Sequence, residues 1–400
     1  MPLALCQASR SIPSALLGLL GLLGAASATQ AAPVPPPLPA EQLTVEQLAA
    51  QSPHWAYVVD EAFQNEIDSR VYLFDGDSYR RLGQIGAGFY PGAILSPDGK
   101  TTAVATTYFS RGTHGERTDV VEFTDNATLD VTGEVVLPPK RALTLPTIFN
   151  LAYSSDERFL YVAYITPATS FGVLDPARRK VLGEIDTAGC VLAIPWGRNQ
   201  VSSLCESGRL LTVGLDDQGH EISRSLSRPF FDADKDPVFV QGIPTSNGYE
   251  FISFLGEVHD IDFTGGRPVA AAPWSLVDAP DRGRWRPGGV QIAALHRALG
   301  RLYVPMHRGG EGSHKDGGTE IWVFDDTRHV RVARWRVPAK ELGAVIAVQV
   351  TQDEHPLLFA ATDNSCLLVF NGITGKLRHV EKALGQTPWV ILTPDVHRPK

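Results

Sequence analysis

The stretch Val71-Tyr72-Leu73-Phe74-Asp75 shows a pattern that recurs along this chain of 400 residues: a short apolar run that ends in Asp or Asn. β-Branched and aromatic residues favour a buried strand, and a terminal Asp or Asn favours a turn directly after it. The run occurs seven times, at intervals of 50, 50, 41, 46, 63 and 46 residues. This spacing is typical of a radial array of small β-sheets. The endpoints of the runs are Asp75, Asp125, Asp175, Asp216, Asp262, Asp325 and Asn371.

A second series of turns lies upstream of these runs, and an apolar strand follows each turn. Ser96-Pro97-Asp98-Gly99-Lys100 and Ser154-Ser155-Asp156-Glu157-Arg158 are two examples. Each repeat therefore consists of strand A, a turn, strand B, strand C, an Asx turn and strand D. Four strands in ~40–50 residues match one blade of a β-propeller. We predict an all-β fold with seven blades.

The two ends of the chain are predicted to complete one blade together. The first repeat starts at a B-type strand, Ala56–Asp60, and the last stops at an A-type strand, Pro388–Leu392. We expect Pro388–Leu392 to be the innermost strand of the blade that also contains Ala56–Asp60, Val71–Asp75 and Arg80–Ile85. This pairing would close the array and remove the exposed sheet edges of an open one.

Residues 1–28 have the features of a signal peptide. A basic residue precedes the apolar stretch Leu16–Leu23, which is too short to span a bilayer, and Ala26-Ser27-Ala28 fits a cleavage site. Cleavage after Ala31 or Ala32 is an alternative, and so is retention of the segment as a membrane anchor. We predict a soluble protein that is exported to the periplasm and does not bind a membrane.

The rest of the chain is predicted to be one domain behind a short extension. Residues 29–52 contain a Pro-rich tether, Pro33–Pro39, and a short predicted helix, Ala40–Gln51. The propeller is expected to occupy residues 53–400, because repeats stacked around an axis can form a single unit of that size.

Three cysteines lie outside the predicted signal peptide. Cys190 and Cys205 flank one hairpin made of an A strand, a turn and a B strand. Antiparallel neighbours can bring two Cα atoms close enough for a disulfide, and closing a loop of this size contributes about 3 kcal/mol in the loop-entropy model. We predict a disulfide rather than two free thiols. Cys366 is expected to be a buried, inert thiol.

The composition and motifs give little sign of chemistry within the chain. The 36 Lys and Arg against 44 Asp and Glu give a net charge of -8, so we expect no binding to nucleic acid. His307, Glu311 and His314 lie in one glycine-rich loop, but their spacing fits no known metal site. No grouping of a nucleophile with a base can be assembled from spacing. We therefore predict no catalytic residue, no metal site and no cofactor-binding residue in this chain.

A resemblance to a known family adds what the repeats do not provide. Trp285-Arg286-Pro287-Gly288-Gly289, followed by Leu295-His296-Arg297-Ala298-Leu299-Gly300-Arg301-Leu302-Tyr303, resembles a run in the heavy (α) subunit of quinoprotein amine dehydrogenases. Tyr108-Phe109-Ser110-Arg111, Gly189-Cys190 and the segment from Val348 to Glu354 are further matches. The resemblance covers essentially the whole chain after the signal peptide.

The resemblance implies a subunit of an enzyme rather than a complete one. In that family the cofactor is tryptophan tryptophylquinone, which is formed on a separate, disulfide-rich light (β) subunit. The seven Trp of this chain are scattered among its repeats, which gives no sign that it carries the quinone itself. The implied assembly is an α2β2 heterotetramer that deaminates primary amines oxidatively to aldehyde and ammonia. It passes electrons to a blue-copper protein of the azurin or amicyanin type.

The family has one branch that acts on aromatic amines and another that acts on methylamine. Leu137-Pro138-Pro139-Lys140-Arg141, Pro273-Trp274-Ser275-Leu276 and Glu320-Ile321-Trp322-Val323 look more like the aromatic branch. We therefore expect a preference for aromatic amines, with a methylamine-specific enzyme as the alternative.

The resemblance assigns a functional role to Phe89. In the family, the matching Phe reaches across the subunit interface and lines the substrate channel. The blade pattern places Phe89 in a loop between a D strand and an A strand, where binding groups are common. Trp285 and Arg286 are expected in another such loop and are candidates for contact with the light subunit, although Trp285 could instead cap the core.

Two other classes of function remain open on the sequence alone. The chain could be an exported propeller that acts by itself as a binding scaffold, or a hydrolase with a metal in its central channel. The predicted A strands offer few ligands for such a metal. A gene for a small cysteine-rich light chain beside this one would favour the amine dehydrogenase.

Overall fold

The computed structural model describes residues 46–143 and 147–394, and the regular secondary structure of this part is mostly antiparallel sheet. Helical segments among these residues are short, namely η1 (Phe63–Asp68), η2 (Ile148–Asn150) and α1 (Ala339–Leu342). None of them is long and apolar enough to cross a membrane. The predicted signal peptide and Pro-rich tether lie outside the described residues.

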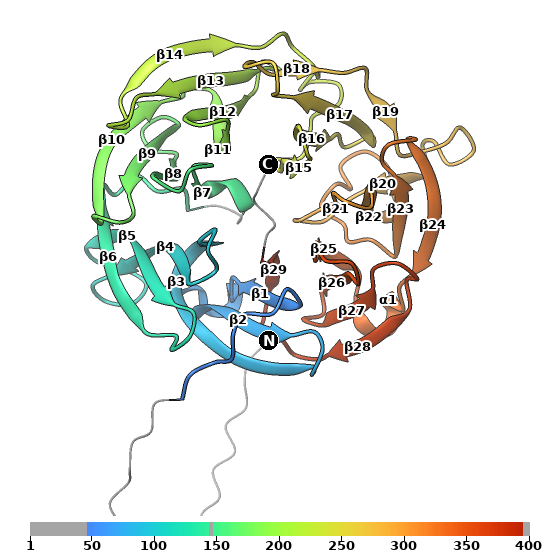
Figure 1. The fold of residues 1–400 in the computed structure, drawn as a ribbon. Helices are drawn as coiled ribbons and strands as arrows, with labels where there is room; N and C mark the ends of the chain where they lie inside the picture. Colours follow the sequence, from blue (N-terminus) through green and yellow to red (C-terminus); the bar gives the residue numbers. More distant parts are fainter. Residues whose placement is uncertain (1–45, 144–146, 395–400) are drawn as a thin grey trace, which may run out of the picture. The chain divides into compact units, whose positions relative to one another are not determined.

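The first sheet has seven strands, in the spatial order β29-β1-β2-β3-β4-β5-β6. Figure 1 shows the sheets in chain order around a common centre. The bounds in the first sheet are β29 (Pro388–Leu392), β1 (Trp55–Asp60), β2 (Ser69–Asp75), β3 (Arg80–Leu95), β4 (Thr101–Phe109), β5 (Arg117–Asp125) and β6 (Val131–Leu137).

Five smaller sheets follow along the chain, with four or five strands each. The second contains β7 (Leu151–Tyr153), β8 (Leu160–Tyr164), β9 (Ser170–Asp175) and β10 (Lys180–Asp186). The third contains β11 (Cys190–Trp196), β12 (Gln200–Cys205), β13 (Leu210–Leu215) and β14 (Glu221–Leu226). The fourth contains β15 (Ile243–Pro244), β16 (Gly248–Ile252), β17 (Glu257–Asp262), β18 (Val269–Ala270) and β19 (Trp274–Ser275).

The fifth and sixth sheets precede β29 in the chain. The fifth contains β20 (Trp285–Pro287), β21 (Ala294–His296), β22 (Arg301–Arg308), β23 (Glu320–Asp325) and β24 (Val330–Arg336). The sixth contains β25 (Val345–Val350), β26 (Leu357–Thr362), β27 (Leu367–Asn371) and β28 (Leu377–Glu381). Neighbouring sheets pack against each other, and β25 and β26 of the sixth sheet contact β29 of the first.

The predicted Asx turns are present at the ends of the apolar runs. The carboxylate of Asp75 accepts a hydrogen bond from the backbone N–H of Asp77 at 3.0 Å, and that of Asp125 accepts one from Ala127 at 2.8 Å. The side-chain amide oxygen of Asn371 accepts a hydrogen bond from the backbone N–H of Ile373 at 3.1 Å. The side chain thus satisfies a backbone donor that the turn leaves free, which explains why Asp or Asn ends the run.

The predicted pairing of the two chain ends is confirmed. Strand β29 lies antiparallel to β1, and Leu392 faces Tyr57 in the register. The carboxylate of Asp60 accepts hydrogen bonds from the backbone N–H groups of Gln386 and Thr387, which lead into β29. The side-chain amide of Gln291 bonds to both the N–H and the carbonyl of Ile391, so it joins β29 to the segment between β20 and β21.

Two sequence-based expectations are wrong in detail. Residues 46–51 are not helical, and the N–H of Leu48 donates to the carbonyl of Ala127 instead of to a helical turn. The segment 80–95 is not a D strand, a loop and an A strand but the single strand β3, which pairs first with β2 and then with β4. Phe89 therefore lies within a strand.

The two ends of the sheets differ in their connections, which gives the molecule two distinct faces. The turn face is the end that holds the Asx turns and the A-to-B turns, such as Ser96–Gly99. The loop face is the opposite end, which holds the connections from one sheet to the next. Phe89 lies at the loop face, because it sits midway along β3 where the strand passes from β2 to β4.

Candidate functional site

Five aromatic rings lie next to one another at the loop face, and we call them the aromatic row. The centroids of Phe89 and Phe109 are 5.5 Å apart, and those of Phe89 and Tyr90 are 4.9 Å apart. Phe63 continues the row, 6.1 Å from Tyr90 and 4.5 Å from Trp389. All four contacts are edge-to-face, and each ring is at least partly exposed or borders the surface. Such a row offers aromatic area to a ligand or partner.

A bulge in β3 sets the direction of two of these rings. Phe89 pairs with Thr107 of β4 and Gly92 with Ala105, so Tyr90 and Pro91 have no partner residue in that pairing. Tyr90 has a φ of 47°, in the left-handed region that only a few per cent of residues other than glycine adopt. Such a conformation persists when the surroundings hold it in place.

The guanidinium group of Arg141 holds this bulge. It donates to the carbonyl of Tyr90 at 2.6 Å, to the carbonyl of Phe89 at 2.7 Å and to the hydroxyl of Thr107 at 2.9 Å. Asp119 accepts from the backbone N–H of Arg141 at 2.9 Å and from the hydroxyl of Thr107 at 2.7 Å. A second arginine, Arg117, donates to both carboxylate oxygens of Asp119.

Burial shapes the electrostatics beneath the aromatic row. It lowers the pKa of Arg141 to about 10, while Asp119 and Glu61 act in the opposite direction, so the guanidinium stays charged at neutral pH. Glu61 is 1% exposed, and burial raises the pKa of its carboxyl group well above the usual value despite the charge of Arg141. Neither carboxyl oxygen of Glu61 has a hydrogen-bond partner among the described residues.

Large apolar side chains are exposed at several points of the loop face. Six of them belong to the first four sheets or their connections, and between 36% and 47% of each is exposed. At the turn face, Leu299 and Ile373 are the exposed large apolar residues within the described turns. Exposed apolar side chains that gather at one end of a molecule are a feature of surfaces that bind partners. The six are Ile67, Tyr108, Ile165, Val191, Val240 and Leu255.

Trp285 does not offer its ring to a partner. It is 4% exposed, and its ring centroid lies 5.1 Å from that of Trp322, which is fully buried. The guanidinium of Arg334 lies over both rings. The position favours the alternative in which Trp285 caps the core, and the neighbouring Arg286 is half-buried.

The Trp285–Trp322 pair also corrects the view that the tryptophans are scattered. The fold brings together two residues that are far apart in sequence, one from β20 and one from β23. Both rings are buried, with arginine side chains over them.

The two histidines expected in one glycine-rich loop lie in different environments, because His307 belongs to β22 and only His314 lies in the loop. His307 is buried and its Nε2 lies 3.0 Å from the hydroxyl of Ser313, whereas His314 stacks on Phe254 with ring centroids 4.0 Å apart. Burial lowers the pKa of both imidazoles. Within residues 46–143 and 147–394, no three His, Cys, Asp or Glu side chains form a group that could hold a metal ion.

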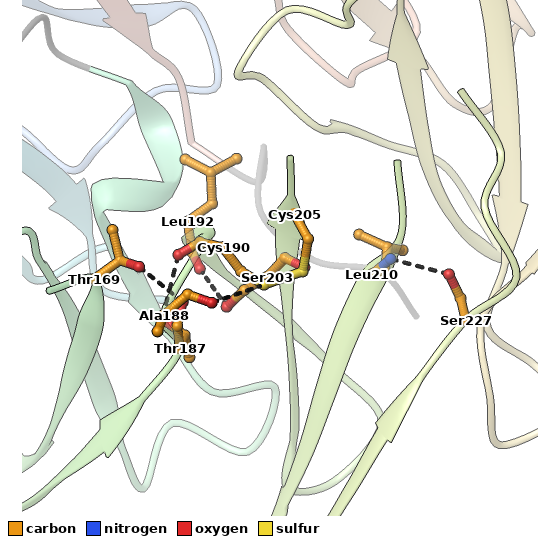
Figure 2. The surroundings of a disulfide bond; sticks show 9 residues. All are labelled: Thr169, Thr187, Ala188, Cys190, Leu192, Ser203, Cys205, Leu210 and Ser227. Atoms are coloured by element: carbon orange, nitrogen blue, oxygen red, sulfur yellow. Dashed lines mark hydrogen bonds between the residues drawn. A yellow bond between two sulfur atoms is a disulfide. The ribbon is translucent and has the colours of Figure 1, made fainter. Parts of the chain in front are cut away.

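The predicted disulfide between Cys190 and Cys205 is present. The two residues face each other in the pairing of β11 with β12, and their Cα atoms are 3.9 Å apart. Figure 2 shows the bridge between these strands, beside Leu192 and Ser203. The hydroxyl of Ser203 donates to the carbonyl of Leu192 at 2.8 Å and ties the same strands together. Cys366 is buried and free, as expected.

One cavity lies at the turn face, away from Phe89. It has a volume of about 810 Å³ and is lined by turn residues of several sheets, among them Ser96, Ser154, Ser246 and Gln352. None of the site residues suggested by the sequence lines it. Sequence reasoning missed Arg141 as a site residue, and its only signal is the family match Leu137-Pro138-Pro139-Lys140-Arg141.

Comparison with known proteins identifies the family. The family model for the methylamine dehydrogenase heavy chain matches residues 53–395. The methylamine dehydrogenase heavy chain of Methylobacillus flagellatus is 26% identical over 360 residues, which are 89% of this chain and 88% of that protein. The same subunit of Paracoccus versutus is 27% identical over 363 residues, 89% of this chain and 83% of that protein.

A solved structure is similar in fold. The dihydro-heme d1 dehydrogenase NirN aligns with 88% of this chain and 78% of its own, with a TM-score of 0.52 and 16% sequence identity. This likeness concerns the fold alone. The family match spans all six sheets, including the strands that carry Phe89 and Arg141. The chain belongs to the methylamine dehydrogenase heavy chain family, whose members are subunits of oxidoreductases that act on the CH–NH2 group of their donors.

Proposed function

We propose that this chain is the heavy subunit of a periplasmic tryptophan tryptophylquinone amine dehydrogenase. The enzyme deaminates primary amines oxidatively, and this chain holds the light subunit and lines the substrate channel. The observation that carries the proposal is the aromatic row at the loop face, where the backbone of Phe89 is held by a buried arginine. Family membership supplies the class of reaction.

The proposal includes a propeller of seven blades. Strand β3 belongs to two blades, because its first half pairs with β2 and its second half with β4. The first sheet then counts as two blades of four strands each, and the other five sheets supply the remaining ones. This division agrees with the seven apolar runs in the sequence.

The light subunit is proposed to bind at the loop face. Interfaces are richest in aromatic and apolar residues at their centre, and the loop face has both. The α2β2 stoichiometry and a blue-copper electron acceptor follow from the resemblance to the family. The quinone on the light subunit supplies the electrophilic carbonyl and accepts two electrons. This chain contributes side chains that line the channel, orient the amine and exclude water.

Aromatic amines are the proposed substrates. The related proteins are named for methylamine, but at 25–27% identity their names describe those proteins. An aromatic substrate can pack edge-to-face against Phe89 and Tyr90, whereas methylamine is too small to use that surface. The row therefore supports a preference for tyramine or phenylethylamine over methylamine.

Co-expression with the light subunit tests the proposal. The purified complex should reduce an electron-accepting dye with phenylethylamine and tyramine, and with a lower kcat/KM for methylamine. The heavy chain alone should show no turnover. Turnover by the heavy chain without a light subunit would contradict the proposal, and so would a heavy chain that binds no light subunit, which would favour the stand-alone scaffold.

A further inference from the structure

We propose that Arg141 is a positioning residue that sets the direction of the Phe89 side chain and thereby the size selectivity of the substrate channel. The inference rests on the proposed function, because it needs Phe89 to line that channel. Arg141 acts through the backbone of β3, since its guanidinium bonds to the carbonyls of Phe89 and Tyr90 rather than to their rings.

The geometry explains why the bulge needs such a partner. The register shift between Phe89 and Gly92 takes this part of β3 out of regular pairing with β4. Two carbonyls in this half-buried segment then need donors, since an unpaired buried carbonyl costs about 1–3 kcal/mol. Arg141 provides both donors from one planar group, and a third N–H···O bond to Thr107 anchors it to β4.

Arg141 is itself held by the neighbouring sheet. Its backbone pairs with Tyr164 of β8 in an isolated bridge, and the N–H of the next residue, Ala142, donates to the carbonyl of Ala163. The carboxylate of Asp119 in β5 accepts a hydrogen bond from the backbone N–H of Arg141. The bulge that carries Phe89 is therefore tied to β4 by the Arg141 side chain, and to β5 and β8 through the backbone of the same segment.

Lysine cannot replace this arginine fully. Its ammonium is a point donor at the end of a flexible stem, whereas the guanidinium holds several donors in one plane. In Arg141→Lys, one of the two carbonyls should lose its donor, and the ring of Phe89 should sample several directions. A displacement of about 1 Å in a positioning group can change rates by on the order of 100-fold, so a tenfold change in selectivity is a reasonable expectation.

The test uses the heterotetramer with both subunits. Arg141→Lys should change the ratio of kcat/KM for phenylethylamine to that for methylamine by about tenfold. Arg158→Lys is the control, because the guanidinium of Arg158 also bonds to three other residues but lies at the turn face. Its ratio should equal that of the unmodified enzyme.

A second pair of variants separates positioning from general destabilisation. In a Phe89→Ala background, Arg141→Lys should no longer change the ratio, because the side chain that it positions is absent. An equal change with and without Phe89 would overturn the inference. Thr107→Val keeps the shape and removes one of the three bonds of the Arg141 guanidinium, together with the bond from Thr107 to Asp119, so it should shift the ratio in the same direction by less. Thr107→Val takes the place of Arg141→Lys in this test if Arg141→Lys does not fold.

Hydrogen exchange provides a readout that does not depend on turnover. Arg141→Lys should speed amide exchange in residues 86–92 while leaving β26, far along the chain, unchanged. Unchanged exchange in residues 86–92 would overturn the inference. If exchange rises there but the assembled heterotetramer oxidises no amine, the role of Arg141 in holding the β3 bulge stands and the proposed function fails.

Discussion

The turn face and the loop face of this protein use polar side chains in different ways. At the turn face, Asp75, Asp125 and Asn371 bond to their own neighbouring backbone. Arg158 and His54 at this face also bond to polar side chains of a neighbouring sheet, and these contacts are ion pairs and hydrogen bonds between exposed or half-buried groups. At the loop face, Arg141 and Asp119 bond across strands and sheets, and apolar side chains remain exposed. The turns thus account for the repeated fold, and the exposed apolar side chains support the proposal that the loop face binds the light subunit.

The strongest test of this division removes the strand that joins the two chain ends. Deletion of residues 389–400 takes away most of β29, including Ile391 and Leu392, which are fully buried. We expect global loss of the folded state, because β1 and Gln291 lose their partners at once. A chain that ends at Pro394 keeps β29 and is the control. Circular dichroism on heating measures the result, and an unchanged melting temperature after the deletion would contradict the closure.

The second test compares exposed apolar residues at the two faces. Leu255→Asp combined with Ile165→Asp places two charges in the proposed interface and should weaken binding of the light subunit by about tenfold or more. Ile373→Asp at the turn face is the matched control, since Ile373 is also exposed. Co-purification and titration of the light subunit measure the effect. Equal weakening by Ile373→Asp would show that binding does not depend on the loop face.

The smallest expected effect is a pH dependence at the turn face. His54 lies 2.8 Å from a carboxylate oxygen of Asp77 and 3.0 Å from one of Asp353. Burial lowers the pKa of His54, but these hydrogen bonds together raise it by more, so its pKa in the folded state lies above 6.5. The protonated form is therefore favoured by folding. Its contribution is complete below the unfolded-state pKa and is lost as the pH rises through the folded-state pKa.

His54→Gln measures that contribution. The variant should be less stable than the unmodified protein by about 1 kcal/mol at pH ~5.5, and the difference should shrink by pH ~8.5. Denaturant unfolding of both proteins at the two pH values gives the comparison. Turnover of the assembled enzyme, which depends on the loop face, should be unchanged. A stability difference that grows with pH would reverse the assigned sign.

The local sequence pattern was sufficient to predict the Asx turns of the turn face. Asp and Asn end the strands because each side chain bonds to a nearby backbone N–H, and this preference is visible in the sequence alone. The pairing of Pro388–Leu392 with β1 follows from counting strands in the first and last repeats. Cys190 and Cys205 face each other because a single hairpin joins them.

The loop face depends on contacts that no local pattern reveals. Arg141 meets Phe89 only after two sheets have packed, and Trp285 meets Trp322 only within the folded fifth sheet. The predicted helix at Ala40–Gln51 failed at residues 46–51 because a backbone contact to Ala127 replaced local hydrogen bonds. Sequence reasoning found Phe89 through family resemblance alone, and it expected a loop where the chain forms a continuous strand.

The selectivity of Phe89→Ala tests the central claim most directly. The measurement is the ratio of kcat/KM for phenylethylamine to that for methylamine, made on the heterotetramer before and after the substitution. If Phe89 lines the channel, the ratio should change by about tenfold while the two subunits still co-purify, because the ring contributes contact area rather than assembly. An unchanged ratio in a fully assembled enzyme would contradict the role of the loop face as the substrate entrance.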